Sequence, residues 1–297
     1  MNLMRTQDVE RQTPPVWRVR GRALPLDRVL VMGIVNVTPD SFADGGKYLD
    51  QTAALAHARR LTDDGADIID IGGESTRPGA IDVSANEEIA RVMPLLEALV
   101  GAGVTVSVDT SKPEVMRAAL AAGAAIINDV RALREPGALE AVAAADCGLI
   151  LMHMQGTPRT MQRAPQYHDV TGEVLQFLSQ RIGQACAHGI DVARIAVDPG
   201  FGFGKSIEHN FTLLSELSAL QRLQRPVVVG LSRKSMLGKA SGRPVDERLA
   251  PSVAAAVLAA EQGARIVRVH DVAATCDGLD VLRMMRAARA NKGTTSR

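Results

Sequence analysis

The stretch Gly123-Ala124-Ala125-Ile126-Ile127-Asn128-Asp129 contains the pattern that decides the fold. A glycine, which can end a helix in the left-handed conformation without steric cost, precedes a short aliphatic run that ends in polar side chains. A glycine also precedes an apolar run at three other places, which are Gly65-Ala66, Gly189-Ile190 and Gly263-Ala264. Strand, helix and glycine therefore alternate along the chain. This alternation predicts a parallel sheet whose strands are connected by helices.

Eight aliphatic runs of this kind occur along the chain. They are Val29–Val35, Asp67–Ile71, Val104–Val108, Ala125–Asp129, Gly148–Met152, Arg194–Val197, Pro226–Leu231 and Arg265–Val269. Continuous aliphatic strands are typical of parallel sheets that are covered on both faces. The segments between the runs show helical periodicity, most clearly from Ile89 to Leu99. Eight such units favour a closed (β/α)8 barrel over an open doubly wound sheet, which usually has fewer strands.

Length and composition agree with one barrel domain. The chain has 297 residues, 46% of them hydrophobic and only 3% aromatic, so we expect an aliphatic core. The 34 basic residues nearly balance the 33 acidic ones, which gives no general electrostatic reason to bind nucleic acid or membranes. We expect the domain to span residues 17–290, with a hairpin at Trp17–Arg28 closing the barrel floor. Residues 1–16 and 291–297 are expected to be disordered tails.

The cysteine and histidine patterns argue against several common kinds of site. The three cysteines show no CxxC spacing and the six histidines include no HExxH motif, which disfavours a disulfide framework and structural zinc. The first residues are polar and charged, and no uncharged apolar run reaches the ~18 residues that span a bilayer. We therefore expect a cytoplasmic protein with small-molecule partners and no nucleic-acid or membrane partner.

The glycine-rich segment Gly200–Ser206 is similar to a phosphate-binding P-loop. Pro199, however, stands where that motif requires its first glycine, so the pattern fails. We interpret the segment as a loop whose glycines let the backbone approach a ligand closely.

Polar side chains follow nearly every predicted strand. In (β/α)8 barrels the loops after the strands build the active site. The polar residues are Asn36, the segment 72–79, Asp109, Asn128, Asp198, Lys234, Arg268 and His270. A single aspartate after a strand is as often a helix cap as a site residue. Repetition on so many strands, with cations beside the carboxylates, indicates one shared site.

The chemical types of these residues form two groups. Asp109 and Asp198 supply carboxylate acceptors, and Asn128 supplies an amide. These groups suit a flat heterocycle with several N–H donors. The cations suit phosphate or pyrophosphate, since arginine can bind phosphate oxygens in a bidentate manner. They are Arg77, Lys234, Arg268 and His270. No Ser/His/Asp or Cys/His set stands out as a nucleophile, which favours direct displacement of an anionic leaving group.

In their order along the chain, these motifs resemble the dihydropteroate synthases, a family of pterin-binding enzymes. The resemblance covers about residues 17–285. It is carried by Met32–Phe42, Gly72–Gly79, Ser107–Pro113, Ile127–Asp129, Met152–Gly156, Asp198–Lys205, Ser232–Ser235 and Arg268–Asp271. It implies a (β/α)8 transferase of folate biosynthesis. Such an enzyme condenses 6-hydroxymethyl-7,8-dihydropterin pyrophosphate with p-aminobenzoate and releases pyrophosphate.

The resemblance also implies residue roles. The pterin would be bound by Asp109, Asn128, Met152, Asp198, Phe203, Gly230 and Lys234. Pyrophosphate would be bound by Asn36, Arg77, Arg268 and His270, with Asn36 also binding Mg2+. The p-aminobenzoate pocket, where sulfonamides compete, would comprise Phe42, Thr76, Pro78 and Ser232. Asp109, Lys234 and Arg77 would be catalytic, residues 76–78 would form a closing lid, and the outer helices would mediate a homodimer.

Two other functions are compatible with a pterin-binding barrel. One is a methyltransferase that passes a methyl group from methyltetrahydrofolate to a corrinoid protein. That enzyme needs no pyrophosphate-binding cations, so Arg268, His270 and the segment 75–78 argue against it. The other is a catalytically silent pterin-binding paralogue, which should have lost part of the motif set. One departure from the family is Pro251, where a small flexible residue is usual; proline is tolerated in a first helical turn.

Overall fold

The computed structural model describes residues 15–38, 47–75, 82–157, 161 and 164–294. Eight parallel strands form its central sheet, one for each predicted run. They are β3 (Leu30–Asn36), β4 (Ile68–Gly72), β5 (Val106–Asp109), β6 (Ile126–Asp129), β7 (Gly148–Met152), β8 (Ile195–Asp198), β9 (Val228–Val229) and β10 (Ile266–Val269). A parallel bridge between Val197 and Val227 joins the two ends of the sheet. The predicted (β/α)8 barrel is therefore confirmed.

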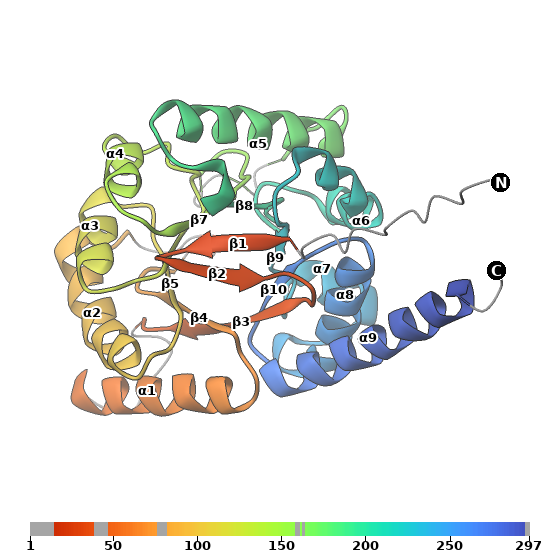
Figure 1. Ribbon diagram of the computed structural model, residues 1–297, viewed down its shortest axis with the longest axis horizontal. Helices are drawn as coiled ribbons and strands as arrows, with labels where there is room; N and C mark the ends of the chain where they lie inside the picture. The colour runs from red at the N-terminus through yellow and green to blue at the C-terminus, as the bar shows by residue number, and fades with distance from the viewer. Residues whose placement is uncertain (1–14, 39–46, 76–81, 158–160, 162–163, 295–297) are drawn as a thin grey trace, which may run out of the picture.

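Helices surround this barrel on its outside (Figure 1). They are α1 (Lys47–Asp63), α2 (Ala85–Gly101), α3 (Pro113–Ala121), α4 (Ala138–Ala143), α5 (Val170–Ala187), α6 (Ile207–Ser215), α7 (Ser235–Ser241), α8 (Leu249–Glu261) and α9 (Val272–Thr294). Gly65, Gly123, Gly189 and Gly263, which precede strands, all have positive φ angles, as the sequence pattern predicts. Within the described part of the chain, no helix is long and apolar enough to cross a membrane.

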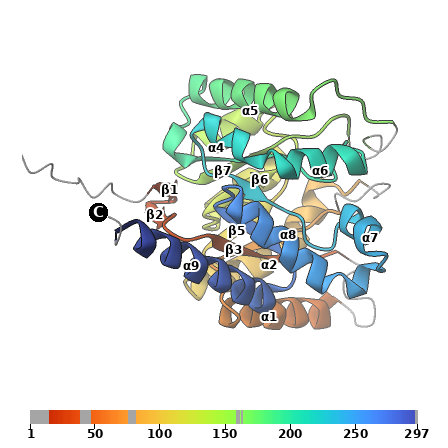
Figure 2. The same cartoon turned by 90° about the vertical axis from the view of Figure 1, so that its right-hand side faces the viewer.

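A two-stranded hairpin closes one end of the barrel, as predicted. Its strands are β1 (Val16–Val19) and β2 (Arg22–Pro25), and it lies across the barrel in Figure 1. The indole of Trp17 is fully buried, and its Nε1 donates a hydrogen bond to Arg194 O at 2.7 Å. Val19 packs so closely that a Cβ atom on Gly148 would lie 2.5 Å from its side chain. The hairpin thus seals the floor, and α7 lies at the opposite end (Figure 2).

The barrel interior changes from apolar to polar along its axis. Side chains alternate along each strand, so every second residue points inward. Near the floor these inward residues form one apolar cluster: Leu30, Met32, Ile68, Ile126, Ile150, Ala196, Val228 and Ile266. Two residues further along their strands come Asp70, Asn128, Asp198 and Arg268. The carboxyl ends of the strands therefore carry a polar layer above a sealed apolar one.

Two features of the last helices bear on the expectations from sequence. Pro251 lies in the first turn of α8, where proline is tolerated. Helix α9 continues to Thr294, past the expected domain boundary at residue 290.

Candidate active site

Strand register brings the predicted polar residues together at one end of the barrel. Asp109 on β5 pairs with Asn128 on β6, and Met152 on β7 pairs with Asp198 on β8. Residues at matching heights on neighbouring parallel strands, with the same inward orientation, must lie close together. The described residues of the expected site therefore lie together at the strand ends.

Arg268 on β10 bridges two carboxylates across the inside of the barrel. Its Nε lies 2.6 Å from Asp70 Oδ2, and its Nη2 lies 3.0 Å from Asp109 Oδ2. Asn128 Nδ2 donates to the same oxygen of Asp70 at 3.3 Å. The four side chains come from four strands, so one guanidinium group links the walls of the site.

Asp70 is a site residue that reasoning from the sequence missed. It is fully buried, and its Oδ1 has no hydrogen-bond partner among the described residues. A signal was present in the run Ile68-Ile69-Asp70-Ile71, where a carboxylate interrupts an aliphatic strand. Burial of a carboxylate costs free energy unless the carboxylate is paired, so such an interruption indicates a positively charged partner inside the protein.

Asp109 has a strongly altered acidity. Burial, opposed by Arg268 and reinforced by the nearby Asp70, raises the pKa of its carboxyl group to about 7. A ligand that draws Arg268 away would remove part of the opposing effect. The charge of Asp109 near neutral pH is therefore sensitive to how the site is occupied.

Asp198 and Lys234 lie beside the glycine loop Gly200–Lys205. Asp198 Oδ1 accepts a hydrogen bond from Gly200 N at 2.7 Å, and burial raises the pKa of its carboxyl group. The Lys234 ammonium donates to Phe201 O and lies 4.6 Å from the centre of the Phe203 ring. Burial, opposed by Asp198, lowers the pKa of Lys234 to about 8.

Ser232 and His270, predicted for different ligands, are in direct contact. The hydroxyl of Ser232 lies 3.0 Å from His270 Nδ1 and accepts a hydrogen bond from His270 N at 3.2 Å. Arg233, between Ser232 and Lys234, turns away and forms a bidentate pair with Asp271 at 2.6 and 3.0 Å. The expected p-aminobenzoate and pyrophosphate residues therefore meet here.

The remaining described predictions also lie at this end of the barrel. Met152 is buried in an apolar cluster against which Phe203 packs. Gly230 is close to Arg268, since a Cβ atom on the glycine would lie 3.9 Å from that of the arginine. The amide oxygen of Asn36 would lie 3.3 Å from a Cβ atom on Gly72, so the glycine leaves room for it. Phe42, Thr76, Arg77 and Pro78, and with them the expected lid, lie outside the described residues.

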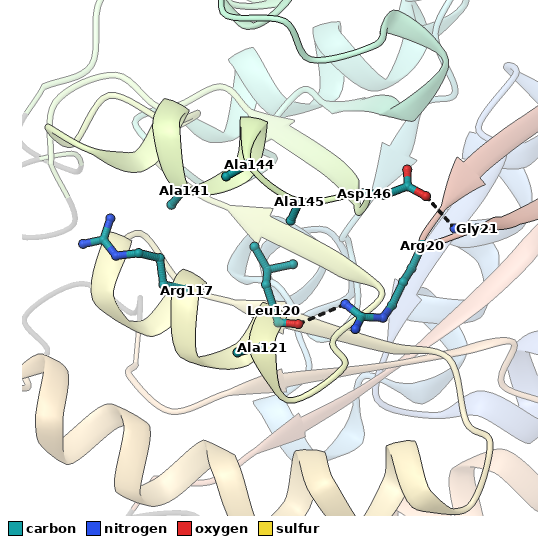
Figure 3. Close-up of a pocket in the computed structure, with 9 residues that line it drawn as sticks. All are labelled: Arg20, Gly21, Arg117, Leu120, Ala121, Ala141, Ala144, Ala145 and Asp146. Atoms are coloured by element: carbon teal, nitrogen blue, oxygen red, sulfur yellow. Dashed lines mark hydrogen bonds between the residues drawn. The ribbon is translucent and has the colours of Figure 1, made fainter.

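A surface cavity of about 640 Å³ lies at the hairpin end of the barrel, away from this site (Figure 3). It is lined by the hairpin turn and by residues of and near α3 and α4: Arg20, Gly21, Arg117, Leu120, Ala121, Ala141, Ala144, Ala145 and Asp146. Arg20 donates to Leu120 O at 2.9 Å, and Gly21 N donates to Asp146 at 2.9 Å. None of the predicted site residues lines it, so this cavity is not the candidate active site.

Comparison with known proteins agrees with this geometry. Residues 32–270 match the profile of the family described as pterin binding enzyme. The dihydropteroate synthase of Escherichia coli strain K12 is 49% identical over 274 residues, covering 92% of this chain and 97% of that protein. This chain belongs to the dihydropteroate synthase family. Another family member, from Neisseria meningitidis serogroup C, is 51% identical over 269 residues, covering 89% of this chain and 95% of its own.

Solved structures of dihydropteroate synthases share the fold. The Xanthomonas albilineans enzyme with 4-aminobenzoic acid superposes with a TM-score of 0.88 at 55% identity, covering 93% of this chain and 99% of its own. The same enzyme in complex with 7,8-dihydropteroate gives a TM-score of 0.82 at 49% identity, covering 92% and 99%. A sulfonamide complex of the Yersinia pestis enzyme gives 0.88 at 49% identity, again covering 92% and 99%.

Proposed function

We propose that this chain is an active dihydropteroate synthase. It joins the amine of p-aminobenzoate to the exocyclic methylene of 6-hydroxymethyl-7,8-dihydropterin pyrophosphate. A C–N bond forms, the C–O bond to pyrophosphate breaks, and the amine loses a proton. The observation that carries this proposal is the buried polar layer at the strand ends, in which carboxylates and an amide lie beside Arg268 and Lys234.

The polar layer suits a pterin because a pterin edge presents a row of N–H donors. Asp198 offers a buried carboxylate, and Asn128 offers an amide oxygen while its Nδ2 is held by Asp70. Met152 and Phe203 supply apolar surface for the flat ring system. We propose that these side chains, with Asp109, Gly230 and Lys234, bind the pterin.

Pyrophosphate would compete for Arg268 with the two carboxylates that hold it in the structure. A guanidinium group can bind two phosphate oxygens at once, and a trianion or dianion attracts it more strongly than one carboxylate. We propose that Arg268, His270, Asn36 and Arg77 bind the leaving group. The methylene becomes positively charged as pyrophosphate departs, and the carboxylate of Asp109 would stabilise that charge.

Mg2+ is a proposed cofactor. Asn36 presents an amide oxygen at the end of β3, which is the hard donor type that Mg2+ prefers. This ion commonly takes one or two ligands from protein and the others from phosphate and water, so a single asparagine fits. When bound, it would neutralise charge on the departing pyrophosphate.

p-Aminobenzoate would bind next to the pyrophosphate residues, because Ser232 touches His270. We propose that Ser232, with Phe42, Thr76 and Pro78, forms this pocket and that sulfonamides compete there. The Yersinia pestis relative has been solved with a sulfonamide drug, and it covers 92% of this chain. Competitive inhibition by a sulfonamide against p-aminobenzoate would test this assignment.

We also propose a homodimer through the outer helices and a cytoplasmic location. Leu258 on α8 and Val281 and Met284 on α9 are 58%, 72% and 65% exposed. Helices α8 and α9 pack side by side, so these apolar side chains can contribute to one interface. Light scattering, which measures molecular mass in solution, would test the homodimer by comparison of the wild type with a Val281→Asp variant. Fractionation of cells would test the cytoplasmic location.

The decisive experiment is an assay of pyrophosphate release by the purified chain. Release should require both dihydropterin pyrophosphate and p-aminobenzoate, and 7,8-dihydropteroate should accumulate in equal amount. Pterin binding without release would indicate the silent paralogue. Demethylation of methyltetrahydrofolate in the presence of a corrinoid protein would indicate the methyltransferase instead.

A further inference from the structure

Lys205, the last residue of the glycine loop Gly200–Lys205, has a fully enclosed side chain. Its exposure is 2%, and its Nζ lies 2.9 Å from Gly200 O, 3.2 Å from Phe203 O and 2.9 Å from His153 Nδ1. A lysine ammonium group has three N–H donors and no acceptor, so these three acceptors match its three protons. None of these three acceptors is a carboxylate.

His153 must then be neutral where it meets Lys205. Its Nδ1 can accept from the ammonium group only if the ring proton is on Nε2. Burial and the neighbouring Lys205 lower the pKa of His153 well below its usual range. Burial also lowers the pKa of Lys205, and the nearby Asp198 opposes that effect. The arrangement is therefore a buried ammonium group held by neutral acceptors, and the negative charge of Asp198 favours its protonated form.

The backbone of the loop winds tightly around this cation. Gly200, Gly202 and Gly204 have φ angles of 68°, 78° and 61°, which residues other than glycine rarely adopt. A Cβ atom on Gly200 would lie 1.9 Å from His153 O, and one on Gly204 would lie 2.4 Å from Gln155 O. This conformation directs the carbonyl groups of Gly200 and Phe203 towards the Lys205 ammonium group, which donates to both, while Gly200 O also accepts from Phe203 N at 3.1 Å.

The outer side of the same loop touches the residues proposed to bind the pterin. Gly200 N donates to Asp198, Phe201 O accepts from Lys234, and the Phe203 ring lies under the Lys234 ammonium. Loss of the internal cation would leave Phe203 O without its donor and Gly200 O with only the hydrogen bond from Phe203 N at 3.1 Å. The Phe203 carbonyl group would turn towards another donor, and the loop contacts to Asp198 and Lys234 would move with it.

We propose that Lys205 is a positioning residue, an internal cation that keeps the glycine loop in the conformation in which Phe203, Lys234 and Asp198 can bind the pterin. The inference rests on the proposed function. It extends that function to a side chain that is enclosed on the far side of the loop. The competing role is core packing, which would affect stability without favouring one substrate over the other.

Lys205→Met removes the charge and keeps a similar length. Loss of one charged hydrogen-bond network should raise KM for pterin pyrophosphate and Kd for a pterin without phosphate about tenfold or more. KM for p-aminobenzoate and kcat should stay within about threefold of the wild type. Lys239→Met, on the exposed side of α7, is the matched control and should leave KM for both substrates unchanged. Equal changes in KM for both substrates, or an unchanged KM for pterin pyrophosphate, would overturn the proposal.

The pH dependence of pterin binding supplies a second readout. Asp198 is faced by Lys234, Arg268, the Gly200 amide and Lys205, all of which lower its pKa against the effect of burial. Removal of the Lys205 charge should raise that pKa further. The acidic limb of pterin affinity should therefore move to higher pH in Lys205→Met, whereas a loss of packing alone would leave it in place.

His153 provides a test that does not depend on whether Lys205→Met folds. The amide oxygen of Asn can take the place of His Nδ1, so His153→Asn should keep pterin KM near that of the wild type. His153→Leu removes the acceptor and should raise pterin KM several-fold at unchanged p-aminobenzoate KM. Equal pterin KM in the two variants would refute the positioning role. A wild-type protein that releases no pyrophosphate would refute the proposed function instead.

Discussion

The guanidinium group of Arg268 lies 2.6 Å from the carboxylate of Asp70, a side chain that is fully buried inside the barrel. Asp109 binds the same guanidinium group at 3.0 Å. Two protein carboxylates thus neutralise the charge of Arg268. A bound pyrophosphate would replace these carboxylates, and the freed Asp109 would face the pterin. We propose that this exchange makes the carboxylates part of the response to the ligand.

Asp70→Asn should shift the pH profile of the reaction. The negative charge of Asp70 contributes to the raised pKa of Asp109, which is about 7. Removal of that charge favours ionisation, so the pKa of Asp109 should fall. If Asp109 acts as a carboxylate, the acidic limb of kcat/KM lies near pH 7 in the wild type and moves to lower pH in the variant. Profiles with coincident acidic limbs would contradict this role of Asp109.

Arg268→Ala should weaken binding of pterin pyrophosphate strongly while sparing a pterin without phosphates. It should also destabilise the protein, because removal of one partner from a buried ion pair costs about 3–5 kcal/mol. The double variant Arg268→Ala/Asp70→Asn should recover part of that stability, since it removes the orphaned charge. Calorimetry with both ligands and urea denaturation would measure these effects. Equal loss of affinity for both ligands would identify a purely structural ion pair.

Asp198→Asn and Asp198→Ala should lose pterin affinity without losing stability. Charged hydrogen bonds of the proposed kind contribute about 1.5–3 kcal/mol each. Burial raises the pKa of Asp198 in the folded protein, so its ionisation opposes folding as pH rises through the carboxyl range. Removal of the carboxylate should leave the melting temperature at pH 7 unchanged or higher. Titration calorimetry and thermal denaturation test both parts, and pterin affinity within a few-fold of wild type would exclude Asp198 as the anchor.

Gly200→Ala should destabilise the protein more than Gly242→Ala. Gly200 and Gly242 have φ angles of 68° and 71°, so both variants carry the left-handed strain of about 1–2 kcal/mol. Only at Gly200 would the new Cβ atom collide with backbone, at 1.9 Å from His153 O, whereas nothing lies within 4 Å at Gly242. The difference between the two free energies of unfolding therefore isolates the steric term. Equal values would show that the loop can move away from His153.

The strands, and the end of the barrel at which the candidate site residues gather, were predictable from the sequence. Local patterns decide both features: aliphatic runs mark strands, glycines end helices, and polar residues follow the strands. Alternation within one strand also separates Asn128 from Asp129 without further information. Asn128 points inward to Asp70, and Asp129 accepts hydrogen bonds from Arg131 N and Leu133 N in the following turn.

The partners of the side chains were not predictable in this way. Arg268 is separated from Asp70 by 198 positions, and Lys205 is separated from His153 by 52. Local periodicity tells which face of a strand a residue occupies. It does not tell the height of that residue relative to the other strands, because register and barrel closure set the height. The sequence by itself therefore determined the barrel, its floor and the family. Only the tertiary structure decided that Asp70 holds Arg268 and that Lys205 lies beneath the glycine loop, since distant segments meet only when the sheet closes.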